Sequence, residues 1–186
     1  MNETLKSIRN RRSTRGYLPE QIKDEELKAI IDAGIYAPSA TNKQPWHFTV
    51  VQNKDLIDRL SDGFKEIAKK SDNEYVKKYG ENEKFHVFYN APTVILVSGD
   101  ESNNYASVDC AAAVENMLIA AESLDIGTCW VGFIAYLLNS EEGKEFVKEL
   151  GIPEGFKQIH SVALGYKKFR SANAPARKEN TVNYIK

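Results

Sequence analysis

The segment YASVDCAAAVENMLIAAESLDIGTCWVGF, which runs from Tyr105 to Phe133, joins a long run of helix-forming residues to a short apolar end. No glycine or proline interrupts it before Gly127, which predicts one long helix that Gly127 stops. Thr128–Phe133 then predicts a short buried strand. Apolar side chains cover most of the helix circumference, so we expect the helix to be largely buried. They are Val108, Ala111, Ala112, Val114, Met117, Leu118, Ala120, Ala121 and Leu124.

The polar residues of this helix exclude a membrane span. Asp109, Glu115, Asn116 and Glu122 interrupt the apolar run. The many alanines would allow another backbone to approach closely, either from the chain's own sheet or from a second subunit.

Length and composition indicate an ordinary globular protein. A chain of 186 residues without repeats, low-complexity segments or a clear linker predicts a single domain over residues 1–186. The net charge of −1 gives no general attraction to nucleic acid or to a membrane surface. Cys110 and Cys129 are typical of reduced structural thiols, and the N-terminus has no apolar signal core, so we expect a cytoplasmic protein.

A basic segment follows the first predicted helix, Glu3–Asn10. Arg11, Arg12, Ser13 and Arg15 place three guanidinium groups and a hydroxyl within five residues. Arginine binds phosphate through two parallel hydrogen bonds, and hydroxyls add neutral donors, so the segment could cradle an anion. A solvated basic helix end is the alternative. An RNA-binding module is disfavoured, because the rest of the chain supplies no matching basic surface.

A polar loop follows the second predicted helix, Glu25–Tyr36, for which Asp24 could be the N-cap. Its residues, Pro38 to Trp46, include two prolines, an indole, and several amide and hydroxyl groups. Asparagine and glutamine offer a donor beside an acceptor, so such a loop could recognise the polar edge of a flat ring. A structural turn, in which Ser39 and Asn42 bond their own backbone, is the alternative.

The remaining elements alternate between strands and helices. Strands are predicted at His47–Gln52, Pro92–Ser98 and Gln158–Gly165, and helices at Lys54–Ala68 and Glu141–Leu150. The charged region Lys69–Lys84 is expected to be a mobile cover over a pocket, and Gly99–Asn104 a polar loop. In the basic tail, which includes Arg170, the β-prone run Thr181–Ile185 could add to the sheet of another subunit.

Several kinds of catalytic site are absent from the sequence. No histidine has a cysteine or carboxylate at ligand spacing, which argues against a metal site. There is no dinucleotide-binding glycine motif, no phosphate-binding Walker loop, and no serine or cysteine in a nucleophile motif. An anion cradle and an amide-rich loop without catalytic side chains suggest that a bound cofactor performs the chemistry.

Four motifs in order resemble the FMN-dependent nitroreductase family over nearly the whole chain. They are the segment Arg-Arg-Ser-x-Arg, the loop Ala-Pro-Ser-x-x-Asn-x-Gln-Pro-Trp-x-Phe, Asn90-Ala91-Pro92 before a strand, and the alanine-rich helix followed by Gly-x-x-Cys-Trp-Val-Gly. An arginine near the C-terminus agrees with them. The resemblance implies an α+β fold: a mostly antiparallel central sheet flanked by helices, in an intertwined homodimer whose C-terminal extension lies on the partner.

The resemblance also implies where FMN would bind, in two clefts at the subunit interface. One subunit would hold the phosphate, ribityl chain and pyrimidine end, and the other would border the ring with its polar loop. A third group, at the end of the predicted strand, would lie along the flavin. The three groups are Arg11, Arg12, Ser13, Arg15 and Arg177; Pro38, Ser39, Ala40, Asn42 and Gln44; and Trp130, Val131 and Gly132. Pro175 stands where many relatives carry a basic residue, and Ala40 stands where some relatives carry a serine.

The implied activity is transfer of hydride from NADH or NADPH, through flavin N5, to an electron-poor acceptor such as a nitroaromatic or a quinone. No side chain is expected to be catalytic in itself. The alternatives are a flavoprotein of the same fold with other reductive chemistry, such as dehalogenation or cofactor breakdown, and a non-catalytic FMN-binding protein.

Overall fold

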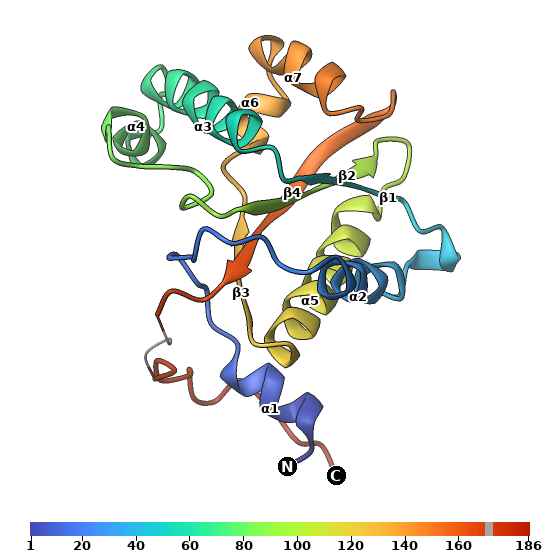
Figure 1. Cartoon of the computed structure of the whole chain (residues 1–186). Coiled ribbons are helices and arrows are strands. Elements are labelled where there is room, and N and C mark those ends of the chain that lie inside the picture. Colours follow the sequence, from blue (N-terminus) through green and yellow to red (C-terminus); the bar gives the residue numbers. More distant parts are fainter. Residues whose placement is uncertain (170–172) are drawn as a thin grey trace.

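The computed structural model describes residues 1–169 and 173–186 of the chain (Figure 1). Arg170, one of the basic residues of the tail, lies outside the described residues. The architecture is α+β, as predicted. Its helices are α1 (Glu3–Asn10), α2 (Asp24–Ile35), α3 (Lys54–Lys69), α4 (Glu74–Glu81), α5 (Ala106–Ser123), α6 (Ala135–Leu138) and α7 (Lys144–Glu149), with 3₁₀ turns η1 (Ala40–Asn42) and η2 (Glu141–Gly143).

A four-stranded antiparallel sheet forms the centre of the molecule. Its strand order is β1 (Trp46–Val51), β2 (Thr93–Asp100), β4 (Phe156–Tyr166) and β3 (Ile126–Val131). The three predicted strands and the one at the end of the long helix are all present, with ends shifted by one or two residues. β2 is buried along nearly its whole length, as expected for a central strand covered on both faces.

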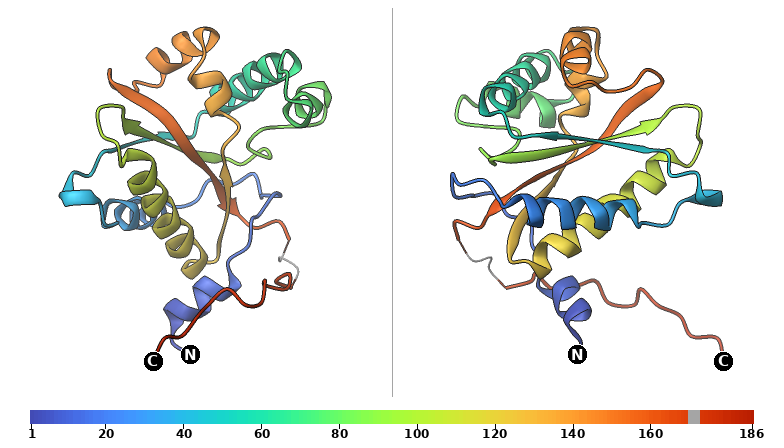
Figure 2. Two further views of the ribbon diagram at one scale, coloured as in Figure 1. Left: turned by 180° about the vertical axis from the view of Figure 1, so that it is seen from behind. Right: turned by 45° about the vertical axis from the view of Figure 1, so that its right-hand side comes forward.

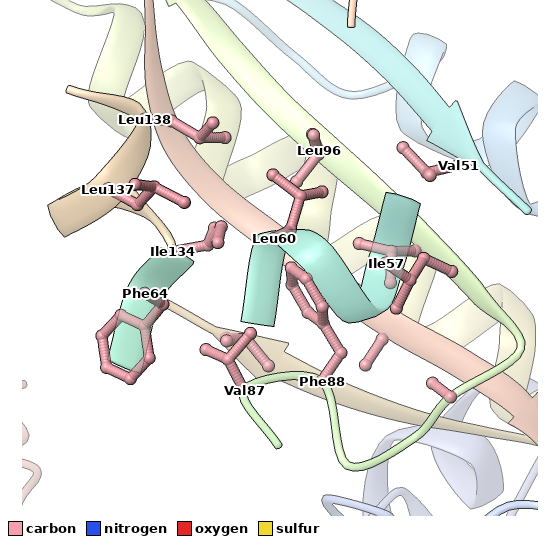
Figure 3. Close-up of a cluster of buried hydrophobic side chains, with 14 of the residues drawn as sticks. Val51, Ile57, Leu60, Phe64, Val87, Phe88, Leu96, Ile134, Leu137 and Leu138 are labelled. Atoms are coloured by element: carbon pink, nitrogen blue, oxygen red, sulfur yellow. The ribbon is translucent and has the colours of Figure 1, made fainter. Parts of the chain in front are cut away.

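Helices cover both faces of this sheet (Figure 2). α2 and α5 lie on one face, and α3, α4, α6 and α7 lie on the other. On the second face, Leu60 and Phe64 of α3 pack with Leu96 of β2 and Leu137 of α6 (Figure 3). On the first face, Met117 and Leu118 of α5 belong to a separate apolar cluster. Successive side chains of a strand point to opposite faces of the sheet, so the core consists of two apolar clusters, one on each face.

The long helix, α5, is largely buried in one chain, as predicted. Met117, Leu118 and Ala121 face the core as predicted, but 66% of the Val108 surface and 40% of the Leu124 surface are exposed. The prediction of a largely buried helix is therefore confirmed, and Val108 and Leu124 are the exposed members of its apolar set. The polar residue Asn116 lies against α2, where its amide donates a hydrogen bond to the Ala33 carbonyl (3.0 Å).

Several predicted helix boundaries need correction. Lys23, not Asp24, is the N-cap of α2, and its N–H donates to the Glu26 carboxylate (2.9 Å). The helix predicted over Glu141–Leu150 is divided into η2 and α7, and α6 was not predicted. Gly99 and Asp100, expected in a loop, extend β2. Such errors arise because short elements depend on tertiary contacts more than on local propensity.

Gly127 does not end the helix, contrary to the prediction. Close packing of neighbouring segments is what requires a glycine at this position. α5 ends at Ser123, and the left-handed residue that follows is Asp125 (φ 57°). Gly127 lies inside β3, where a β-carbon would come within 2.7 Å of Thr14 Cγ2 and 2.9 Å of Lys167 Cγ. The absent side chain thus lets the N-terminal segment and the end of β4 approach β3.

Gly127→Ala is expected to lower the free energy of unfolding by about 1–3 kcal/mol, because an added methyl group would force these neighbours apart. Chemical denaturation measures the change. Gly132→Ala is the matched control, since a β-carbon there meets no atom within 4 Å. Equal stability of the two variants would contradict the packing role.

Two further segments were predicted from composition. The region Lys69–Lys84 contains α4, which packs against α3, so it is structured over much of its length; its mobility stays a prediction. The described tail, 173–186, is exposed throughout and makes no strand pairing with the described residues of its own chain. The side chain of Ile185 is fully exposed. Pairing of Thr181–Ile185 with another subunit stays a prediction.

Candidate functional site

The basic segment after α1 runs beside the edge strand β3. Ser13 forms a parallel bridge with Thr128, and the Thr14 N–H donates to the Thr128 carbonyl (2.7 Å). Arg11 and Arg15 lie two positions before and after Ser13, so the three share one side of an extended segment. All three lie close enough to Cys129 to lower the pKa of its thiol, against the larger effect of burial. The sheet edge therefore aligns three of the predicted site residues. Within the described residues, neither guanidinium is paired with a carboxylate.

Arg12 and Thr14 lie between these residues and make different contacts. The Arg12 guanidinium donates to the carbonyls of Arg9 (2.8 Å) and Arg11 (2.6 Å), which satisfies acceptors at the end of α1. Its Nε atom is buried without a partner among the described residues. The contribution of Arg12 to an anion site stays a prediction, and its observed contacts are structural.

Arg15 lies over the ring of Tyr89, with 5.5 Å from the guanidinium carbon to the ring centroid. Hydrogen bonding with Tyr89 raises the pKa of Arg15, and burial opposes this effect. The geometry is that of a cation–π contact, which restrains a long and otherwise flexible side chain. Tyr89 was not predicted as a site residue, although it directly precedes the Asn90-Ala91-Pro92 motif.

The end of β3 presents alternate side chains to opposite faces of the sheet. Cys129 and Val131 belong to the core on the α3 side, where burial raises the pKa of the Cys129 thiol. Trp130 points to the other face, is 37% exposed, and meets His160 edge-to-face with centroids 4.8 Å apart. The side chains of Trp130 and Val131 therefore cannot border the same face of a ring. Any contact of Val131 with a ligand has to come from its backbone.

Gly132, which follows β3, leaves open space. It is exposed, and no atom lies within 4 Å of the position that a β-carbon would occupy. The next residue, Phe133, packs against an aromatic group that the sequence reasoning did not identify. Its other members are Phe64, Tyr75, Tyr79 and Phe85, and the Tyr75 and Tyr79 hydroxyls are 3.1 Å apart.

The polar loop after α2 has internal hydrogen bonds of the kind that the structural-turn alternative predicts, and its recognition of a ring stays a prediction. Ser39 Oγ accepts from the Gln44 N–H (2.9 Å), and the Gln44 amide donates to Asn42 Oδ1 (3.1 Å). The Ala40 N–H donates to both carboxylate oxygens of Asp109 (3.2 Å each). Asp109 is buried in α5, so the long helix positions the loop. The bond between Ser39 and Gln44 is the turn contact expected of a structural loop.

The loop and the basic segment lie well apart within one chain. In all three views, η1 and the segment after α1 occupy different sides of the molecule (Figures 1 and 2). Arg177 belongs to the exposed tail and donates to the Pro175 carbonyl (3.1 Å). One chain thus brings together Arg11, Ser13 and Arg15 with the end of β3, but not with Pro38, Asn42 or the rest of the loop.

Other kinds of site find no support in the described residues. Within 1–169 and 173–186, no group of three or more His, Cys, Asp or Glu side chains could hold a metal ion. None of the helices there has the length and apolar character needed to cross a bilayer. Both cysteines are free and buried, as expected of structural thiols, and burial raises the pKa of Cys110 to about 12.

Comparison with known proteins defines the class to which this fold and site belong. The nitroreductase family model matches residues 8–166. A putative NADH dehydrogenase/NAD(P)H nitroreductase of Archaeoglobus fulgidus is 36% identical over 174 residues, which cover 90% of this chain and 87% of the relative. An FMN reductase [NAD(P)H] of Bacillus subtilis is 27% identical and covers 99% of this chain and 74% of the relative.

The solved structures agree. A nitroreductase with bound FMN from Bacteroides fragilis superposes with a TM-score of 0.94 at 36% identity, and both chains are covered completely. A nitroreductase with bound FMN from Desulfitobacterium hafniense gives 0.92 at 32% identity, again over both complete chains. The chain belongs to the nitroreductase family, as its sequence motifs indicated.

Proposed function

We propose that the protein is an FMN-dependent oxidoreductase that passes reducing equivalents from NADH or NADPH to an electron-poor acceptor such as a nitroaromatic or a quinone. The observation that carries the proposal is the alignment of Arg11, Ser13 and Arg15 along Thr128 and Cys129 of β3, the strand that leads to the open backbone at Gly132. Relatives that are named FMN reductase and NAD(P)H nitroreductase support it. When bound, FMN supplies N5 as hydride acceptor and donor, and gains negative charge near N1 and O2 on reduction.

The residues present fit this cofactor. Two guanidinium groups without carboxylate partners among the described residues, beside an exposed serine hydroxyl, suit a phosphate dianion and the polar ribityl chain. Arg11 and Ser13 would hold the phosphate end. Arg15, restrained over Tyr89, would face the pyrimidine end and stabilise the charge that develops there. Gly132 would leave room for the ring, and Trp130 and Val131 would contribute from β3.

The rest of the site would come from a second copy of the chain. Pro38, Ser39, Ala40, Asn42 and Gln44 would border the ring from the partner. Arg177 would join Arg11 and Ser13 of the first chain at the phosphate. Two observations support a homodimer: the two halves of the predicted site lie apart in one chain, and apolar surface on α5 and in the tail is exposed. Val108 on α5 and Ile185 in the tail would become buried on association.

We further propose that residues 1–186 act as one domain and that the enzyme works in the cytoplasm. Both apolar clusters lie against the same sheet, which supports a single domain. The free thiols of Cys110 and Cys129 suit a reducing compartment.

A spectrum of the purified protein tests the proposed function. The protein is expected to be yellow, with flavin absorbance bands that bleach when NADH or NADPH is added without oxygen and return when a quinone or nitroaromatic is added. Colourless protein that gains no absorbance with added FMN would overturn the proposal. Bound flavin that NAD(P)H does not bleach would favour a non-catalytic FMN-binding protein.

The aromatic residues of α4 make a separate prediction. Tyr75 is 62% exposed, and its ring lies 6.1 Å from that of Phe133, next to Gly132. Because a flat acceptor can stack on such a surface, Tyr75→Ala is expected to raise KM for an aromatic acceptor about threefold to tenfold, since an aromatic contact is worth roughly 0.5–1.5 kcal/mol. FMN content should not change. Tyr75→Phe is the control, and an unchanged KM in Tyr75→Ala would exclude α4 from acceptor binding.

A further inference from the structure

The turn that presents Tyr89 to Arg15 has an unusual backbone. Tyr89 (φ 55°) and Asn90 (φ 56°) both adopt the left-handed conformation. Asparagine takes this conformation readily, but tyrosine seldom does, because its β-carbon crowds the backbone. Two successive left-handed residues persist only where surrounding contacts hold them.

His86 supplies those contacts. Its Nδ1 atom accepts from the N–H groups of Phe88 (3.1 Å) and Asn90 (3.3 Å), and its carbonyl accepts from the Tyr89 N–H (2.8 Å). Three consecutive N–H groups of the turn therefore bond to one residue. Because Nδ1 accepts, the imidazole proton lies on Nε2.

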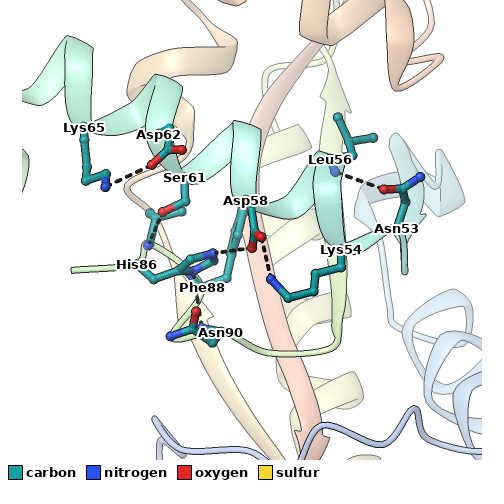
Figure 4. Close-up of polar contacts among 11 residues, drawn as sticks. Asn53, Lys54, Leu56, Asp58, Ser61, Asp62, Lys65, His86, Phe88 and Asn90 are labelled. Carbon is teal, nitrogen blue, oxygen red and sulfur yellow. Dashed lines mark hydrogen bonds and ion pairs between the residues drawn. The ribbon is translucent and has the colours of Figure 1, made fainter. Parts of the chain in front are cut away.

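The imidazole is in turn anchored to α3 (Figure 4). Its Nε2 atom lies 3.4 Å from Asp58 Oδ1, and Asp58 pairs with Lys54. The neighbouring Val87 N–H donates to Ser61 Oγ of the same helix (3.0 Å). Burial lowers the pKa of His86, which favours the neutral ring, and Asp58 opposes this effect. The remaining charge facing it, Asp62, is engaged by Lys65.

We propose that His86 is a positioning residue for Arg15: it holds the left-handed turn, the turn fixes the Tyr89 ring, and the ring holds the guanidinium where the pyrimidine end of FMN would bind. The inference rests on the proposed function, since it assigns a purpose to Arg15 in the flavin site. His86 touches neither the flavin nor a substrate in this scheme. Its effect is on how often Arg15 occupies the orientation that stabilises bound flavin.

Paired variants at His86 test the proposal. His86→Phe keeps a ring but removes the Nδ1 acceptor, whereas His86→Asn places Oδ1 close to the position of Nδ1. Tyr89→Leu removes the aromatic surface and Tyr89→Phe retains it. The readouts are the dissociation constant of FMN from the apoprotein and the midpoint potential of the bound flavin.

His86→Phe and Tyr89→Leu are expected to weaken FMN binding several-fold. They should also reduce the preference for reduced over oxidised flavin about tenfold, which corresponds to about 30 mV for a two-electron couple. His86→Asn and Tyr89→Phe should stay within about twofold of the wild type. In an Arg15→Ala background, His86→Phe should cause no further shift in potential, because coupled residues are not additive.

Three outcomes would overturn the inference: unchanged affinity and potential in either His86→Phe or Tyr89→Leu, a shift in the Arg15→Ala background as large as in the wild type, or a loss of FMN affinity in His86→Asn as large as in His86→Phe. If His86→Phe does not fold, His86→Gln, whose side-chain amide lies near the Nε2 position and not the Nδ1 position, takes its place. The Tyr89 pair and its cycle with Arg15→Ala then test the contact between Tyr89 and Arg15. A wild type that does not bind FMN would overturn this inference and the proposed function together. A wild type that binds FMN, with variants that behave like it, would overturn this inference alone.

Discussion

Arg11→Ala is expected to release most of the bound FMN. The substitution removes a guanidinium that the structure leaves without a carboxylate partner among the described residues, beside Ser13 at the edge of β3. A hydrogen bond to a charged group is worth roughly 1.5–3 kcal/mol, so the dissociation constant should rise by about 10-fold to 150-fold. The ratio of flavin absorbance to protein absorbance, and titration of the apoprotein with FMN, measure the loss.

Arg9→Ala is the matched control for this variant. Arg9 is an exposed arginine on α1, and its backbone carbonyl, not its side chain, is the group that contacts Arg12. The control removes the same charge from the same region and should keep its flavin. If Arg11→Ala retains FMN as tightly as Arg9→Ala, the phosphate end of the cofactor does not bind at this edge.

Mixing two defective variants is expected to restore flavin binding. Arg11→Ala damages the half-site beside β3, and Asn42→Asp damages the loop half-site while keeping a side chain that tolerates the left-handed conformation at this position (φ 56°). Homodimers of either variant would hold two defective sites. In a mixed dimer, one site combines both defects, and the other combines intact Arg11 with intact Asn42 from different chains.

Random exchange of subunits should therefore regenerate about a quarter of the wild-type FMN sites, because about half of the dimers are mixed and each has one intact site. Flavin content and NAD(P)H-dependent quinone reduction, measured after the variants are co-expressed, report this recovery. Co-expression of Arg11→Ala with Arg15→Ala, both in the same half-site, is the control and should restore nothing. Absence of recovery in the first mixture would mean that the loop and the basic segment do not share a site.

Local pattern explains how much of the fold could be predicted. The strands have alternating or continuous apolar residues, and α3 has a clear apolar stripe, so their existence followed from periodicity alone. Short elements were missed or misplaced: α6 has only four residues, and η2 is a single turn held by the Ser140 hydroxyl and carbonyl. Their stability comes from neighbours that a local window does not contain.

Some residues of the candidate site could likewise be proposed from local sequence, and others could not. Arg11, Ser13 and Arg15 could be proposed from the sequence because their residue types and spacing suit an anion. The structure adds that their segment runs along β3, so that alternate residues share one side. The cation–π partner Tyr89 and the buried Asp109 were not identified, since Asp109 holds a loop that lies 69 positions away in the sequence. Contacts of this kind depend on how the chain returns to itself.

The sequence Tyr105–Phe133 by itself determined a long helix followed by a strand, because helix propensity and apolar pattern are local properties. Only the tertiary structure decided which side of that helix is covered, that Asp125 and not Gly127 turns the chain, and that Gly127 is required by the approach of Thr14 and Lys167. It also decided that the basic segment and the polar loop lie apart in one chain. The physical reason is that burial and close approach are properties of pairs of segments, and the sequence of one segment does not specify its partner.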